Sequence, residues 1–94
     1  MKFIVSYDIE PDGVRRRVAE ILECFGTRIQ RSVFDCDLDE AGLKDLVGKL
    51  RRALKEDRNG NLRFYRVCRH CLEASFGLGG IDPPEEEEPC IILD

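Results

Sequence analysis

Two amphipathic helix patterns, separated by β-rich runs, constrain the fold of this chain most strongly. The first pattern covers residues 14–25 and the second covers residues 39–55. Their apolar positions are Val14, Val18, Ile21, Leu22 and Phe25 in the first, and Leu43, Leu46, Val47, Leu50 and Leu54 in the second. This spacing places the apolar side chains on one side of each helix. Two such helices can cover one face of an antiparallel sheet.

The β-rich runs supply that sheet. We expect strands at residues 2–8 and 62–68, and a weaker strand at residues 71–78. Residues 2–8, with the sequence KFIVSYD, are almost continuously apolar, which is typical of a central strand. Residues 27–38 predict either one long bent strand or two short strands that break near Arg31 and Ser32.

The order of these elements predicts an α+β, ferredoxin-like fold of the type β-α-β-β-α-β. The whole sequence has 94 residues, and the expected domain covers residues 1–78. Asp12 and Gly26 are expected to cap the first helix, and Asp39 is expected to cap the second. A core of this size is modest, so a homodimer that buries more surface is expected.

Residues 79–94 differ in composition from the preceding domain. Residues 79–89 predict a polar, acidic linker, whereas residues 90–93, CIIL, predict an extra strand at a sheet edge of this chain or of a partner. No apolar run has the roughly 20 residues that a membrane span needs, and the first strand is too short for a secretion signal. A cytoplasmic location without membrane contact is therefore expected.

The charge is distributed unevenly along the chain. The net charge is −4, but residues 1–80 carry 15 basic and 13 acidic side chains, whereas residues 81–94 carry six acids and no base. Eleven of the basic residues are arginine, whose planar guanidinium suits bidentate contact with phosphate. The body of the chain is thus compatible with nucleic-acid binding.

Asp8 lies where the first strand ends, before a turn that contains proline and glycine. One interpretation is a residue that shapes the turn or caps the helix. The other is a ligand for a hard cation, because Mg²⁺ is held in proteins by one or two carboxylates.

Three arginines, residues 15–17, follow in the first helix, where they oppose the helix dipole. Arg16 is expected to face solvent, whereas Arg15 and Arg17 flank the apolar stripe near the sheet rim. They form either ion pairs with Glu20 and Glu23 or a phosphate-binding group beside Asp8.

The run RIQRSVF, residues 28–34, places Arg28, Gln30 and Ser32 on one face if the strand is regular. Phe34 is expected more in the core than as a platform for a nucleobase.

Cys68 and Cys71 form a Cys-x-x-Cys pair around the single histidine. Tetrahedral zinc needs four ligands, and one pair is a weak indication of such a site. A redox-active pair normally begins a helix, whereas this pair joins two expected strands. Core or edge thiols are the preferred interpretation.

Several of these motifs together resemble the CRISPR-associated protein 2 family, the small subunit of the CRISPR adaptation complex. The matching segments are Tyr7–Ile9, the arginines at 15–17, Gly26, TRIQRSVFDCDL at 27–38, and NLRFYRVCRHC at 61–71. The resemblance covers residues 2 to 77.

The resemblance implies a homodimer in which the aspartate that matches Asp8 faces Mg²⁺ or Mn²⁺ at the dimer axis. It implies a role in acquiring new spacers with a CRISPR integrase subunit, and endonuclease activity on single-stranded RNA or double-stranded DNA. Asp8 is the candidate catalytic residue and metal ligand. The residues carried over for nucleic-acid binding are Tyr7, Arg15, Arg17, Arg28, Ser32 and Phe34.

Two functions remain open at this point, and a third lies outside the family. The first is a metal-dependent phosphodiesterase, in which arginines stabilise charge that develops on the phosphate. The second is a non-catalytic DNA-binding scaffold that bridges integrase subunits; it is favoured slightly because no histidine or lysine is placed as an obvious general base. The third is a ferredoxin-like domain that binds another ligand.

Overall fold

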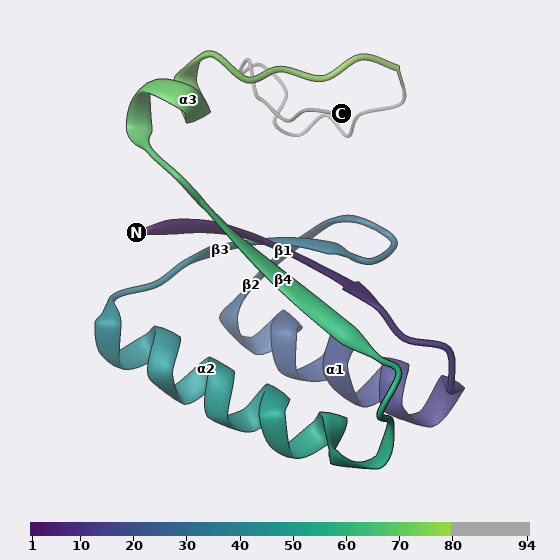
Figure 1. Ribbon diagram of the computed structural model, residues 1–94. Coiled ribbons are helices and arrows are strands. Elements are labelled where there is room, and N and C mark those ends of the chain that lie inside the picture. The colour runs from purple at the N-terminus through teal and green to yellow at the C-terminus, as the bar shows by residue number, and fades with distance from the viewer. Residues whose placement is uncertain (80–94) are drawn as a thin grey trace.

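The computed structural model describes residues 1–79, which form a layer of two helices on one face of a four-stranded sheet (Figure 1). The helices are α1 (Asp12–Phe25) and α2 (Glu40–Ala53), and the strands are β1 (Lys2–Asp8), β2 (Gly26–Gln30), β3 (Val33–Asp37) and β4 (Asn61–Val67). The strand order is β2-β3-β1-β4, and every neighbouring pair is antiparallel. This topology confirms the predicted ferredoxin-like fold class.

The core lies between the sheet and the two helices. Along β1, the buried side chains are Phe3, Val5 and Tyr7, and the residues between them point to the other face of the sheet. The apolar stripes of both helices close the core from the opposite side, with Val18, Leu22, Leu46 and Leu50 buried. The predicted helical stripes therefore face the sheet.

The run at residues 27–38 divides into β2 and β3, which confirms the prediction of two short strands over that of one long bent strand. Residues 31 and 32 form the turn, and the backbone N–H of Tyr7 donates a hydrogen bond to the carbonyl oxygen of Ser32 at 3.1 Å. The β2–β3 pairing also shifts register between Arg28 and Gln30. Because of this shift and the turn, the run is not one regular strand, so the condition under which Arg28, Gln30 and Ser32 would share a face is not met.

The helix ends confirm two expected caps and correct one. The Asp39 carboxylate accepts a hydrogen bond of 2.7 Å from the Gly42 N–H at the start of α2. Asp12 lies inside α1, whose N-cap is Pro11 and has no side-chain hydrogen bond. Gly26 is the C-cap of α1, as expected: its backbone is extended, with φ −166°, and its N–H donates a hydrogen bond to the carbonyl oxygen of Leu22.

Close packing explains the glycine at position 26. A Cβ atom there would lie 2.3 Å from the carbonyl oxygen of Asp35 and 2.6 Å from the Cys36 Sγ. The absence of a side chain therefore lets the start of β2 pair closely with β3.

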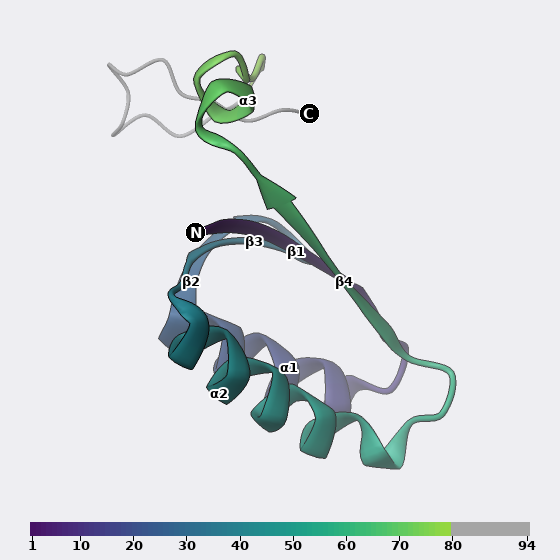
Figure 2. The ribbon, with the colours of Figure 1, turned by 60° about the vertical axis from the view of Figure 1, so that its left-hand side comes forward.

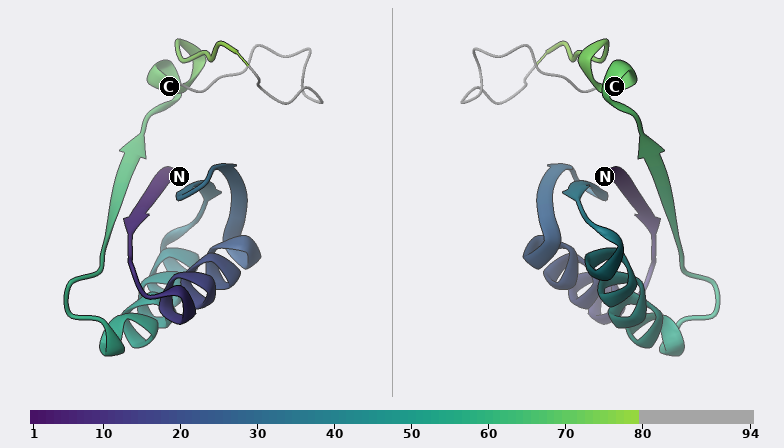
Figure 3. Two further views of the ribbon diagram at one scale, coloured as in Figure 1. Left: turned by 90° about the vertical axis from the view of Figure 1, so that its right-hand side faces the viewer. Right: turned by 90° about the vertical axis from the view of Figure 1, so that its left-hand side faces the viewer.

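The segment after β4 is helical, which corrects the weak strand predicted at residues 71–78. Helix α3 spans Arg69–Glu73, and its residues lack the β-branched side chains that favour strands. Strand β4 extends beyond the rest of the sheet and carries α3 to the side opposite α1 and α2, as Figures 2 and 3 show. A short 3₁₀ turn, η1 (Leu54–Glu56), follows α2.

Part of the predicted C-terminal organisation lies outside the described residues. This applies to the acidic linker beyond Gly79 and to the edge strand expected at residues 90–93. Among the helices of residues 1–79, none combines the length and the apolar character required to cross a membrane.

Candidate nucleic-acid and metal site

Asp8 is the last residue of β1, and its side chain is exposed. It pairs in register with Asn61 of β4. Because side chains alternate along a strand, Asp8 shares its face with Ser6 and Ile4, whereas Tyr7 points into the core. The carboxylate therefore lies at the rim of the sheet face that α1 and α2 leave uncovered. Within residues 1–79, it forms no salt bridge.

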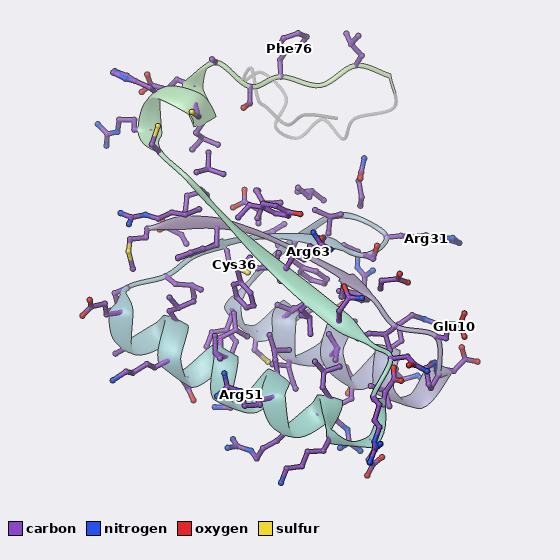
Figure 4. The ribbon with its side chains drawn as sticks, in the orientation of Figure 1. Glu10, Arg31, Cys36, Arg51, Arg63 and Phe76 are labelled. Carbon is purple, nitrogen blue, oxygen red and sulfur yellow. The ribbon has the colours of Figure 1, made fainter. Side chains whose placement is uncertain are left out.

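Two residues of β4 extend this face and were not singled out from the sequence. Arg63 pairs with Ser6, one diagonal step from Asp8, and Tyr65 pairs with Ile4. Tyr65 is 50% exposed, and Figure 4 shows Arg63 on β4 together with Arg31 at the tip of the β2–β3 hairpin. The alternation in NLRFYRV was the available signal, since Leu62 and Phe64 point toward the core.

The donor groups around Asp8 limit which metal site one chain can form. No group of three or more His, Cys, Asp or Glu side chains comes together within residues 1–79. One chain thus presents a single carboxylate, with the amide of Asn61 across the strand pair. Mg²⁺ needs only one or two carboxylates and keeps several waters, so this donor set fits a hard cation.

Arg15 is engaged within its own chain. Its Nη1 atom donates to the carbonyl oxygens of Glu10 at 2.8 Å and Ile9 at 3.2 Å, and its Nη2 atom pairs with the Asp12 carboxylate. These contacts hold the loop that follows Asp8. The ion pairs with Glu20 or Glu23 considered above do not form.

Arg16 and Arg17 are exposed, and neither forms a salt bridge within the described part of the chain. Arg17 lines a pocket of about 320 Å³ between the start of α1 and the end of α2, beside Glu56. The three consecutive arginines therefore divide into one that holds a loop and two that remain available to an anion.

Arg28 is held by three neighbours. Its guanidinium lies 4.9 Å from the centre of the Phe34 ring, its Nη2 atom is 3.4 Å from Glu23 Oε2, and its Nη1 atom donates to the Arg31 carbonyl oxygen. Each contact restricts the guanidinium, although the residue as a whole remains exposed.

Tyr7 and Phe34 are core residues. Tyr7 is 7% exposed and Phe34 is fully buried, and their rings stack with centres 6.4 Å apart. The Tyr7 hydroxyl donates to the Arg31 carbonyl oxygen at 3.3 Å. The core position of Phe34 is as expected from its sequence. The rings of Tyr7 and Phe34 offer no surface to a nucleobase, which corrects the nucleic-acid contacts that the resemblance implies for them. Instead, they support the hairpin that carries Arg28, Arg31 and Ser32.

The cysteines also differ from the sequence-based interpretation. Cys68 is the N-cap of α3, so the Cys-x-x-Cys pair does begin a helix. Both of its cysteines are exposed, whereas Cys36 is buried and burial raises the pKa of its thiol to about 11. Among the cysteines of the described residues, only Cys36 lies in the core.

The family model described as "CRISPR associated protein Cas2" matches residues 1–74. A curated relative from Chloroflexus aurantiacus, named "CRISPR-associated endoribonuclease Cas2 1", is 38% identical over 93 residues, which cover 99% of this chain and 100% of the relative.

Two solved structures share the fold. Streptococcus pyogenes Cas2 has a TM-score of 0.74 at 27% identity, with 84% of this chain and 100% of that chain covered. A chain from a structure titled "Partial Cas6-RT-Cas1--Cas2 complex" has a TM-score of 0.76 at 25% identity, with 98% of each chain covered.

Proposed function

Because this chain belongs to the CRISPR associated protein Cas2 family, we propose that it acts in CRISPR adaptation as a homodimer that binds nucleic acid and an integrase subunit. The integrase partner is supported by the structural relative whose title names Cas1 together with Cas2. The homodimer is supported by the uncovered sheet face, where Tyr65 is half exposed beside Ile4.

The activity that we assign is metal-dependent cleavage of phosphodiester bonds in single-stranded RNA or double-stranded DNA. The name of the Chloroflexus relative, an endoribonuclease, supports this class of reaction. The observation that carries the assignment is the exposed Asp8 carboxylate at the sheet rim, diagonal to Arg63 and beside a loop held by Arg15.

Each residue has a distinct role in this proposal. Asp8 of each copy would hold Mg²⁺ or Mn²⁺, which when bound would supply a Lewis acid for phosphodiester hydrolysis. Arg63, on the same sheet face as Asp8, would bind phosphate oxygens and oppose the negative charge that develops on them. Arg17, between α1 and α2, would contact other phosphates of the nucleic acid. Arg15 would fix the position of the Asp8 loop without touching the substrate.

A second candidate function is a non-catalytic scaffold that binds DNA between integrase subunits. The position of His70 favours it. Asp8 pairs with Asn61 at the start of β4, whereas His70 follows the end of that strand. Six residue steps at roughly 3.4 Å put the two ends about 20 Å apart. The one imidazole of the chain is therefore remote from Asp8 as a general base.

Cleavage of labelled RNA and duplex DNA by the full chain separates the two functions. With Mg²⁺ present, Asp8→Asn should reduce cleavage by orders of magnitude, because the amide keeps the size of the side chain but loses the charge that holds a hard cation. Glu10→Gln is the matched control, since this exposed carboxylate lies two residues away in the same loop. Chelation of the metal should have the same effect as Asp8→Asn.

Binding of duplex DNA, measured on the same proteins, should change little in Asp8→Asn. Equal cleavage by the wild type and Asp8→Asn would exclude Asp8 as the catalytic residue and leave the scaffold function. An unfolded Asp8→Asn protein, detected by circular dichroism, would instead identify Asp8 as a structural turn residue.

A further inference from the structure

Cys68 and Cys71 lie on one turn at the beginning of α3. The Cys68 Sγ atom accepts a hydrogen bond of 3.4 Å from the backbone N–H of Cys71, and both residues are exposed. A spacing of three residues places both side chains on the same side of a helical turn. The two thiols are thus close enough for rotation of their side chains to bring the sulfur atoms together.

The surroundings of the pair distinguish the two sulfur atoms. Hydrogen bonds from the backbone N–H of Cys71 and then from its thiol lower the pKa of the Cys68 thiol, and the bond between the two thiols raises the pKa of the Cys71 thiol. The thiolate is the nucleophilic form of cysteine, so Cys68 is the more reactive member. This asymmetry is typical of a pair in which the first cysteine attacks and the second resolves.

A pocket gives small molecules access to Cys68. It has a volume of about 540 Å³ and lies where the end of β4 meets the beginning of β1. Its charged lining residues are Lys2, Asp37, Arg66 and Arg69. The Met1 ammonium, which also lines the pocket, pairs with Asp37, and Lys2 pairs with Asp35. The exposed guanidinium groups of Arg66 and Arg69 therefore favour an anionic solute, and Cys68 itself lines the pocket.

From this arrangement, we propose that Cys68 and Cys71 form a redox-active dithiol that is oxidised by anionic small-molecule disulfides of the glutathione type. The Cys68 thiolate attacks one sulfur of the oxidant, the S–S bond breaks, and one thiolate leaves. The Cys71 thiol loses its proton and attacks the Cys68 sulfur, which releases the second thiolate. The protein loses two electrons and two protons overall, and the oxidant becomes two thiols.

The other described cysteines serve as internal references. Cys36 is fully buried, and its raised pKa keeps it in the unreactive thiol form at neutral pH. Cys24 is exposed on α1, with no cysteine beside it on that helix. Exposure alone would make Cys24 react as Cys68 does, whereas the paired geometry predicts an intramolecular disulfide only at α3.

The experiment incubates the reduced, full-length chain with oxidised glutathione and maps disulfides by peptide mass spectrometry. The wild type should form an intramolecular Cys68–Cys71 disulfide. Cys71→Ser should stop at a mixed disulfide between glutathione and Cys68. In Cys68→Ser, the mixed disulfide at Cys71 should form at least tenfold more slowly than the one at Cys68 in the wild type. Cys24→Ser should form the Cys68–Cys71 disulfide as the wild type does.

The wild-type chain alone decides the outcome, whether or not the variants fold. Glutathione retained on Cys68 without closure to Cys71 would overturn the proposal. So would a dominant disulfide between two chains or to Cys90, or modification of Cys71 before Cys68. None of these results depends on nuclease activity or nucleic-acid binding.

Discussion

The guanidinium of Arg15 donates a hydrogen bond of 2.8 Å to the carbonyl oxygen of Glu10, two residues after Asp8. The same nitrogen reaches the carbonyl oxygen of Ile9, so the first turn of α1 holds the loop at the end of β1. Arg16, the next residue, has no salt bridge within residues 1–79. Adjacent arginines therefore have different roles, and substitutions can separate them.

Arg15→Met should lower the free energy of unfolding by about 1 kcal/mol, because it removes charged hydrogen bonds to two backbone carbonyls at a partly exposed site. Arg16→Met is the control and should change it by less than about 0.5 kcal/mol. Urea denaturation measures both values. Equal effects of the two substitutions would contradict the structural role of Arg15.

Arg17→Gln should weaken nucleic-acid binding without changing the free energy of unfolding, because its guanidinium is exposed and forms no salt bridge in the described residues. Loss of one phosphate contact should reduce the slope of log affinity against log salt by about 0.7–0.9. Fluorescence anisotropy with labelled DNA at several salt concentrations gives this slope. An unchanged slope would exclude Arg17 from the phosphate contacts.

Gly26→Ala should destabilise the fold by roughly 1–3 kcal/mol, because the added Cβ would overlap the Asp35 carbonyl oxygen in the paired β3 strand. Gly13→Ala is the matched control, since a Cβ there meets no atom within 4 Å. Alanine in the first turn of α1 should stabilise by about 0.5–1 kcal/mol. The midpoint of thermal unfolding should therefore fall for Gly26→Ala and rise for Gly13→Ala.

Tyr65→Asp should shift the proposed homodimer toward the monomer, because it places a charge in the middle of the uncovered sheet face. Arg51→Asp, on the exposed part of α2 (Figure 4), introduces the same side chain away from that face and should leave the dimer intact. Multi-angle light scattering at micromolar concentration measures the mass of each. A wild-type monomer under these conditions would exclude the proposed dimer.

The sequence by itself determined the ferredoxin-like class and the location of Asp8 at a strand end. The apolar stripes of α1 and α2 and the run up to Tyr7 are periodic over many residues, and such patterns report which face of an element is buried. The Asp39 cap was also predictable from the sequence, because an N-cap carboxylate accepts a hydrogen bond from a backbone N–H only a few residues away.

Only the tertiary structure decided how individual side chains are used. Arg15 and Arg17 have the same side chain in one helical turn, but only Arg15 meets the carbonyl groups of a loop. Gly26 is required by the approach of β3, and Tyr7 is held in the core by its contact with the Phe34 ring of a neighbouring strand. These outcomes depend on groups that are distant in sequence, whereas periodicity describes only the immediate neighbours of a residue.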